Sequence, residues 1–275
     1  MDISTADVVK LRKVTGAGMM DCKNALTQAE GDFDRAIEII RERGKLVASK
    51  RADREATEGV VLAKVTADKK FGAVVVLNCE TDFVAKNENF IGFTEKIIDL
   101  ALDNRAEDLQ SVLALNLDGR TIEQQVMEQT GVIGEKIELS FYGKLNAEYV
   151  MAYIHPGNKL ATLAGFNKQE VELQVAKDVA MQVAAMSPIA VDKDSVPQAV
   201  VEKELEIAKE KFRLEGKSEN MLDKIAMGAV QKWFAEVTLN NQVYVKDGKI
   251  TIKEFLAQHD KTLAITGFVR YSLNL

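Results

Sequence analysis

The amino-acid sequence predicts an α+β protein: an N-terminal three-helix module, then two related α+β subdomains, the second carrying an inserted antiparallel helical hairpin. Three observations predict this architecture. The first part shows helical spacing of apolar side chains, a strand pair followed by a helix occurs twice, and two charged amphipathic helices interrupt the second occurrence. The predicted parts are residues 1–55, 56–145 and 146–275, with the hairpin at about 198–234.

Length and composition are those of a globular protein with about two domains. The chain has 275 residues, of which 47% are hydrophobic and 28% charged, and domains average roughly 100–200 residues. Its longest apolar runs, such as 73–77, are far shorter than the roughly 20 residues that span a bilayer. The chain start lacks the regions of a secretory signal, and two cysteines do not make a disulfide framework. We therefore expect a cytoplasmic protein without a membrane segment.

The charge balance does not indicate a general polyanion-binding surface. Lys and Arg number 36 against 42 Asp and Glu, which gives a formal net charge of −6, and phosphate binding needs clustered cations. Residues 41–54 are a local exception, because six basic side chains there outnumber two acidic ones. A solvated linker or helix end is the simpler interpretation of this stretch, and phosphate binding is the alternative.

Caps and glycines predict the three N-terminal helices. Ser4 opens the first helix, and the glycine-rich residues 15–18 end it. A second helix covers about 20–29. Asp32 caps a third helix, whose apolar residues keep helical spacing until Gly44. Together these helices form a minimal bundle.

The hydrophobic period changes after the module. Residues 59–66 and 72–78 are β-branched runs around a polar turn, which predicts a β-hairpin. A helix with apolar residues on one side follows over about 89–102, and a capping box opens another over 121–129. Residues 137–145 return to a strand pattern, which completes the first subdomain.

A second strand pair and helix follow at once. Residues 149–154 and 160–166 have strand patterns around a turn, and a helix is predicted over about 170–185. Few identities relate the two rounds, so the pattern indicates a structural repeat rather than a sequence repeat.

The second round is interrupted by a charged segment. Residues 198–215 and 219–234 are amphipathic and close as an antiparallel helical hairpin. A strand-like run at 243–245, a helix capped by Thr251 and a last strand at 263–273 then complete the subdomain. The hairpin is therefore predicted to be an insertion.

Motifs for enzymatic chemistry fail on inspection. Residues 216–218 resemble the end of a phosphate-binding loop, but Lys211 stands where its first glycine belongs. Residues 16–21 resemble a dinucleotide loop, but no strand leads into them. His155 and His259 are the only histidines, and neither lies in a metal-ligand pattern. The sequence therefore predicts no metal site and no cofactor, and it leaves a catalytic carboxylate pair unsupported.

Two features suggest contact with a partner. Met19 and Met20 are adjacent on a helix and cannot both face one narrow core stripe, so at least one should be exposed, although the other can still pack in the core. Phe83 lies in the short polar connection 79–87, where it either tucks under the hairpin or projects toward another molecule. Composition alone favours tucking.

Two long segments resemble a known family. Residues 16–26 (GAGMMDCKNAL) and 78–86 (NCETDFVAK) are similar to the two signature segments of elongation factor Ts, and the resemblance includes 200–204 (VVEKE) and 266–270 (TGFVR). It covers essentially the whole chain. In this family the N-terminal module resembles a ubiquitin-associated fold and grips a helix of the nucleotide-binding domain of elongation factor Tu.

The resemblance implies a function without covalent chemistry. A member of this family is a guanine-nucleotide exchange factor that binds elongation factor Tu with GDP and promotes GDP release during translation elongation. It would do so by disturbing the magnesium and phosphate site. The implied protein is not an enzyme and carries no cofactor.

The resemblance also implies which residues meet the partner. Phe83 would wedge between helices near the magnesium site, and Asp82 would bring negative charge and a competing hydrogen-bond acceptor. The implied contacts are the loop residues Thr81, Asp82, Phe83 and Val84, the N-terminal residues Arg12, Met19, Met20 and Lys23, and, as weaker candidates near the phosphate-binding region, Leu160 and Ala161.

Two features depart from the family pattern. Some members carry a histidine where this chain has Gln182, so the role of an imidazole there cannot be transferred. Some members continue into a C-terminal helical module, whereas this chain stops at Leu275, so contacts from such a module are expected to be absent or replaced.

Other interpretations stay open. A ribosome-associated helical-hairpin protein without exchange activity would contact RNA through 41–54, and its binding would weaken steeply with salt. An exchange factor is not expected to bind nucleic acid directly. An enzyme of unknown substrate is a third interpretation, and homodimerisation through the core is possible in any of them.

Overall fold

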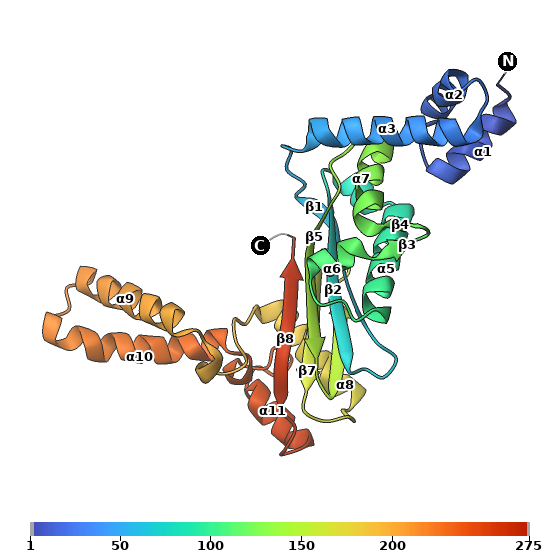
Figure 1. Ribbon diagram of the computed structural model, residues 1–275. Coiled ribbons are helices and arrows are strands. Elements are labelled where there is room, and N and C mark those ends of the chain that lie inside the picture. Colours follow the sequence, from blue (N-terminus) through green and yellow to red (C-terminus); the bar gives the residue numbers. More distant parts are fainter. Residues whose placement is uncertain (1–2, 274–275) are drawn as a thin grey trace.

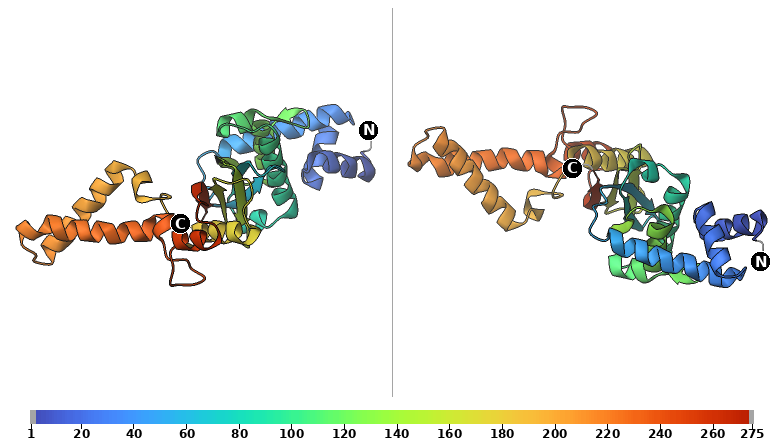
Figure 2. Two further views of the ribbon diagram at one scale, coloured as in Figure 1. Left: turned by 90° about the horizontal axis from the view of Figure 1, so that it is seen from below. Right: turned by 90° about the horizontal axis from the view of Figure 1, so that it is seen from above.

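The computed structural model describes residues 3–273, so the outermost residues of the first and last predicted parts lie outside it. Two three-stranded sheets form the centre of the molecule (Figure 1). The N-terminal helices and the helical hairpin project from opposite sides of this centre in both further views (Figure 2). Within the described residues, no helix is long and apolar enough to cross a membrane.

Three helices form the N-terminal module, as predicted: α1 (Thr5–Thr15), α2 (Met19–Gln28) and α3 (Phe33–Arg51). Ser4 caps α1 by accepting the Asp7 N–H at 3.1 Å, and Asp32 caps α3 in the same way. The module has its own apolar core, to which all three helices contribute: Val8, Leu11, Ala17, Cys22, Ala25, Leu26, Ala29, Ala36, Ile39 and Ile40.

The third helix does not end before Gly44, which corrects the sequence prediction. It runs on to Arg51, because Gly44 lies at the crossing of α3 with α7 (Ile122–Ile133). A Cβ added at Gly131 of α7 would lie 2.1 Å from the Cα of Gly44. The glycine pair therefore lets two helix backbones touch, and the stretch predicted as a linker is mostly helical.

The first sheet has the order β1-β2-β5, all antiparallel. Its strands are β1 (Glu58–Val65), β2 (Phe71–Cys79) and β5 (Glu138–Asn146), and α5 (Glu88–Asp103) and α7 cover its outer face. The predicted capping box at Thr121 and Gln124 is confirmed. The short helix α6 (Leu109–Ala114) and the hairpin β3 (Asn116–Leu117) to β4 (Arg120–Thr121) were not predicted, because they are too short to show a period.

The second sheet repeats this arrangement with the order β6-β7-β8. Its elements are β6 (Tyr149–Ile154), β7 (Leu160–Phe166), α8 (Leu173–Met186), α11 (Ile252–His259) and β8 (Ile265–Ser272). The inner faces of the two sheets pack on one another through alanine and branched aliphatic side chains: Val61, Ala63, Val74, Val76, Val150, Ala161 and Leu163. The centre is therefore layered helix, sheet, sheet, helix.

The segment 243–245 is not a strand, which corrects a second prediction. Only a single bridge links Val243 to Thr251. Gln182 holds the segment instead, because its amide donates to the Val243 carbonyl and accepts the Val245 N–H, both at 3.0 Å. The strand-like composition reflects the burial of Tyr244 in the second core rather than pairing in a sheet.

The helical hairpin consists of α9 (Gln198–Leu214) and α10 (Glu219–Val237), flanked by the 3₁₀ turns η1 (Lys193–Ser195) and η2 (Leu239–Asn241). The chain segments that enter and leave the hairpin lie side by side. The Ile189 N–H donates to the Val237 carbonyl, and the Leu239 N–H donates to the Ala190 carbonyl. Both helices bury only a narrow seam: Ala208, Leu222, Ala226, Val230 and Phe234.

The crossing of α3 with α7 provides a matched pair of substitutions. Gly131→Ala should lower the free energy of unfolding by about 1–3 kcal/mol, because its methyl carbon must displace the α3 backbone. Gly44→Ala should be neutral or stabilising by up to about 1 kcal/mol, since its methyl carbon would meet Gly131 at 3.5 Å. Urea unfolding measures both variants, and equal destabilisation by the two would contradict this description of the crossing.

Candidate functional site: the connection between the first sheet and α5

The connection after β2 is a tight turn followed by one turn of helix. β2 ends at the buried Cys79, and burial raises the pKa of this thiol to about 12. Residues 80–81 turn the chain, α4 (Asp82–Ala85) follows, and Asn87 caps α5 by accepting the Asn89 N–H at 2.9 Å. A local cap therefore orders the end of the connection at which α5 begins.

Phe83 projects outward from this helical turn. Its side chain is 82% exposed, whereas the neighbouring Ala85 is buried and Val84 packs against the first core. The expectation from composition that Phe83 tucks under the hairpin is therefore wrong. The space beneath the turn is already filled by Cys79 and Ala85, so Phe83 remains on the surface.

Asp82 is ionised and paired within the connection. Lys86 Nζ lies 2.6 Å from Asp82 Oδ2, and this contact lowers the pKa of the aspartate. Both side chains are substantially exposed, so the pair contributes little to stability. The carboxylate beside Phe83 is therefore available to another molecule once Lys86 moves away.

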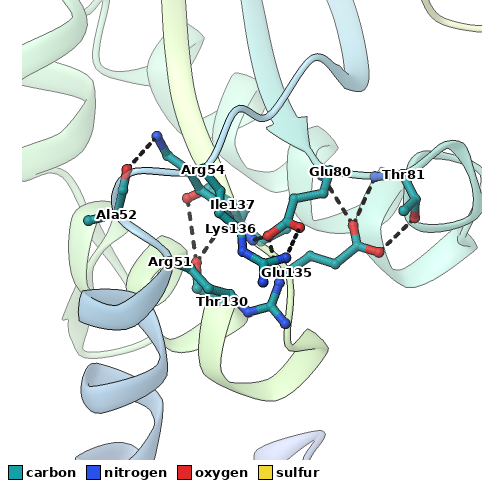
Figure 3. A network of polar contacts seen from close by, with 9 residues as sticks. All are labelled: Arg51, Ala52, Arg54, Glu80, Thr81, Thr130, Glu135, Lys136 and Ile137. Carbon is teal, nitrogen blue, oxygen red and sulfur yellow. Dashed lines mark hydrogen bonds and ion pairs between the residues drawn. The ribbon is translucent and has the colours of Figure 1, made fainter.

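Two glutamates hold the turn before α4 (Figure 3). The Glu135 carboxylate accepts the N–H groups of Glu80 and Thr81 at 3.1 and 3.0 Å, and the Thr81 hydroxyl at 2.6 Å. In return, the Glu80 carboxylate accepts the Lys136 N–H at 2.6 Å. We call these reciprocal contacts of Glu80, Thr81, Glu135 and Lys136 the clasp.

Glu80 also ties the clasp to the end of α3. Arg51 and Arg54 donate to its carboxylate at 2.7 and 3.1 Å. The Lys136 N–H, together with these guanidinium groups, lowers the pKa of Glu80 to about 2, although partial burial acts in the opposite direction. Arg51 and Arg54, which belong to the basic stretch predicted to be solvated, therefore form ion pairs within the chain.

A cleft of about 680 Å³ lies between α1 and the core beside this connection. From α1 it is lined by Val9, Arg12 and Lys13, and from the core by Val84 and Asn87. The C-terminal turns of α7 form its floor, with Gln129, Val132 and Ile133. The structure therefore brings together Arg12 and Val84, two candidates from distant parts of the sequence.

The other N-terminal candidates lie on the module surface. Met19 and Met20 are 36% and 65% exposed at the start of α2, so the prediction that at least one is exposed is confirmed. Lys23 is exposed one turn later. None of these three lines the cleft.

The weaker candidates differ from one another. Leu160 is half-buried at the start of β7, whereas Ala161 is fully buried between the two sheets. The side chain of Ala161 is therefore not exposed in this chain, and contact of either residue with a partner stays a prediction. Gln182 is also fully buried, and its amide satisfies backbone groups of 243–245, so its position in this chain is structural.

Neither histidine is placed for metal binding. His155 Nδ1 lies 3.0 Å from the Tyr153 hydroxyl, and His259 lies 3.2 Å from Glu172. Across residues 3–273, no group of three or more His, Cys, Asp and Glu side chains could hold a metal ion.

Sequence analysis missed Glu135, Glu80 and Lys86. Lys86 carried a readable signal, because it stands four residues after Asp82, the spacing of an ion pair on a helix. Glu135 carried none, since it lies 54 residues from Thr81 in sequence and meets it only through the fold.

Comparisons with known proteins agree with this architecture. The family model described as "Elongation factor TS" matches residues 80–274. A protein named elongation factor Ts from Porphyromonas gingivalis is 51% identical, over 100% of this chain and 99% of its own length. Proteins of the same name from Azobacteroides pseudotrichonymphae and Christiangramia forsetii are 49% and 47% identical, over all and 98% of both chains respectively.

The N-terminal module, the paired sheets and these matches together define a translation elongation factor. The chain belongs to the elongation factor Ts family, which confirms the resemblance read from residues 16–26 and 78–86.

The lowered pKa of Glu80 predicts where its contribution to stability is lost. Its ionised carboxylate stabilises the fold above the ordinary value of 4.5, and this contribution disappears as the pH falls toward 2. Glu80→Gln should therefore lower the free energy of unfolding by about 1–3 kcal/mol at neutral pH. The difference from wild type should shrink below pH 4.5.

Urea unfolding at a series of pH values measures this difference. Glu206→Gln, on the exposed side of α9, is the control and should leave the free energy of unfolding within about 0.5 kcal/mol of wild type at neutral pH. A Glu80→Gln effect that stays constant from neutral to acid pH would contradict the ionised clasp.

Proposed function

We propose that this chain is a guanine-nucleotide exchange factor for elongation factor Tu. It binds the GDP-bound GTPase and promotes GDP release during translation elongation, in the cytoplasm, by disturbing the magnesium and phosphate site. It performs no covalent step and is not an enzyme. The family membership supports the partner, and the exposed Phe83 supports the mechanism.

One observation carries the mechanism: an aromatic side chain is held outward on an ordered turn. Phe83 is 82% exposed, and the clasp and the Asn87 cap fix the backbone on both sides of it. A large apolar side chain in this setting gains free energy only by burial in another molecule. An exposed aromatic side chain on a fixed backbone is what a wedge that enters the partner needs.

Exchange by such a wedge follows from thermodynamic linkage. If the chain binds nucleotide-free partner more tightly than GDP-bound partner, it must weaken GDP binding by the same factor. Phe83 serves this purpose if its pocket in the partner opens only when the nucleotide site is distorted. Asp82 adds to the effect, because a carboxylate near the site competes for groups that hold magnesium and phosphate.

The N-terminal module supplies a second contact. Arg12 lines the cleft beside Val84, and the exposed thioethers of Met19 and Met20 form a flexible apolar surface on α2. A partner helix seated against the module would therefore be held at a fixed position relative to Phe83. Lys23 on α2, and Leu160 and Ala161 at the start of β7, remain predicted contacts.

The RNA-binding alternative is less well supported. Four of the six cations in 41–54 form ion pairs within the chain: Arg41 with Glu128, Arg43 with Asp21, and Arg51 and Arg54 with Glu80. Paired cations contribute less to phosphate neutralisation than free ones. We therefore favour a protein partner with no direct nucleic-acid contact, while homodimerisation through the core stays a prediction.

Phe83→Ala tests the wedge. The variant should accelerate GDP release from elongation factor Tu about 10- to 150-fold less than wild type, because a buried phenylalanine contributes about 1.5–3 kcal/mol. Its own unfolding free energy should change by less than about 0.5 kcal/mol, since the side chain is exposed. Stopped-flow release of a fluorescent GDP and thermal melts measure the two quantities.

Leu214→Ala is the matched control, because Leu214 is 80% exposed at the end of α9 and lies far from the connection. It should leave release unchanged. Normal exchange by Phe83→Ala would contradict the wedge mechanism, although the exchange activity itself would stand.

Asp82→Ala tests the role of charge. Raising free magnesium should slow exchange by the wild type more than exchange by the variant, because only the wild type acts by opposing magnesium contacts. The same release assay across magnesium concentrations measures this. Parallel magnesium dependence of the two proteins would show that Asp82 does not act on the ion.

A further inference from the structure

Three hydrogen bonds from one carboxylate fix the direction of the turn that presents Phe83. Glu135 accepts the Glu80 N–H, the Thr81 N–H and the Thr81 hydroxyl at 3.1, 3.0 and 2.6 Å. Bonds to an ionised acceptor are stronger than those between neutral groups. The backbone of both turn residues is thus bonded to one side chain from the connection between α7 and β5 (Figure 3).

The helical turn α4 does not fix itself. Thr81 is its N-cap residue, yet its side chain makes no cap hydrogen bond and its hydroxyl points to Glu135 instead. A single helical turn is unstable on its own, because nucleation costs more than one turn of hydrogen bonds returns. Since Phe83 follows Thr81 by only two residues, its direction depends on the backbone that Glu135 holds.

Glu135 is itself well supported. It follows the left-handed cap Gly134 at the end of α7, and the next residue, Lys136, donates its N–H to Glu80. α7 contacts α3 at the Gly44–Gly131 crossing and lines the cleft through Val132. The carboxylate therefore lies directly after the helix that also contacts α3 of the N-terminal module.

We propose that Glu135 is the positioning residue of the exchange connection. It touches no partner group. It holds the backbone of Glu80 and Thr81 so that Phe83 and Asp82 are presented in one orientation before the partner binds. This inference rests on the proposed function, because positioning matters for exchange only if Phe83 acts in exchange.

Three variants separate the clasp from charge and from folding. Glu135→Ala removes all three bonds. Glu135→Gln keeps the geometry, because its amide oxygen can accept both N–H groups and its NH₂ can donate to the Thr81 hydroxyl. Thr81→Val removes only the hydroxyl bond and should have a smaller effect than Glu135→Ala.

The first measurement uses the full-length chain alone. Amide hydrogen exchange of Glu80 and Thr81 should become about tenfold faster or more in Glu135→Ala, since each N–H loses its hydrogen-bond acceptor. Glu135→Gln should stay close to wild type. The sheet amides of β2 should be unaffected in both variants.

The second measurement is GDP release from elongation factor Tu across chain concentrations. Glu135→Ala should lower the release rate at saturation by about 10- to 100-fold, and the half-saturating concentration should change much less. Partial unfolding would do the opposite, because it reduces the active fraction and leaves the saturated rate intact. In a Phe83→Ala background, Glu135→Ala should add little.

The proposal would be supported by near-wild-type GDP release in Glu135→Gln, together with a loss of release rate in the double variant that is smaller than the two single losses combined. It would be overturned if Glu135→Ala and Glu135→Gln were equally impaired, if the amides of Glu80 and Thr81 exchanged normally in Glu135→Ala, or if Glu135→Ala released GDP at the wild-type rate while Phe83→Ala did not. If Phe83→Ala itself released GDP normally, the wedge mechanism would fail and positioning with it, and faster amide exchange in Glu135→Ala would then show a purely structural clasp. If the wild-type chain did not accelerate GDP release, the proposed function itself would fail.

Discussion

The close crossing of α3 and α7 is the contact on which the arrangement of both candidate surfaces depends. Two glycines let the helix backbones touch, so α3 is packed directly on α7 at this crossing rather than attached by a linker. Its 19 residues span roughly 28 Å. The other two helices of the N-terminal module, α1 and α2, lie at one end of α3, and Arg51 reaches the clasp at its other end. α3 therefore fixes the separation between the exposed methionines and Phe83.

A fixed separation has a direct consequence for binding. Two contacts on one rigid frame are presented together, so the loss of conformational freedom is incurred on folding rather than on association. The same rigidity makes linkage effective, because a partner that accepts both contacts must adapt its own structure to them. The clasp extends this frame by a short distance, from the end of α3 and α7 to the residues before Phe83.

The sequence predicted most regular elements but not the contacts that connect them. Capping boxes at Thr121 and Thr251 marked helix starts because the signal is local. The predicted end of α3 before Gly44 was wrong, since a glycine at a helix crossing looks in sequence like a helix end. The outward direction of Phe83 could be inferred only from the family resemblance, because it depends on what fills the space beneath it. Glu135 had no local signal at all.

The duplicated architecture shows how one connection became available for function. In the first subdomain, the residues between β2 and α5 carry the exposed Phe83, and Glu135 bonds to the turn that precedes it. The corresponding residues between β7 and α8 are closed off: Asn167 exchanges hydrogen bonds with Thr262 and Ala264, and Lys168 pairs with Asp260, whose pKa this contact lowers to about 2. Those bonds tie the second connection to the segment before β8. In the first subdomain, Glu135 instead precedes β5 and bonds to residues 80 and 81 of the turn. These bonds leave the side chain of Phe83 exposed. Similar elements therefore give a closed connection in one subdomain and, in the other, the exposed surface to which we assign partner binding, according to which side of the turn is bonded.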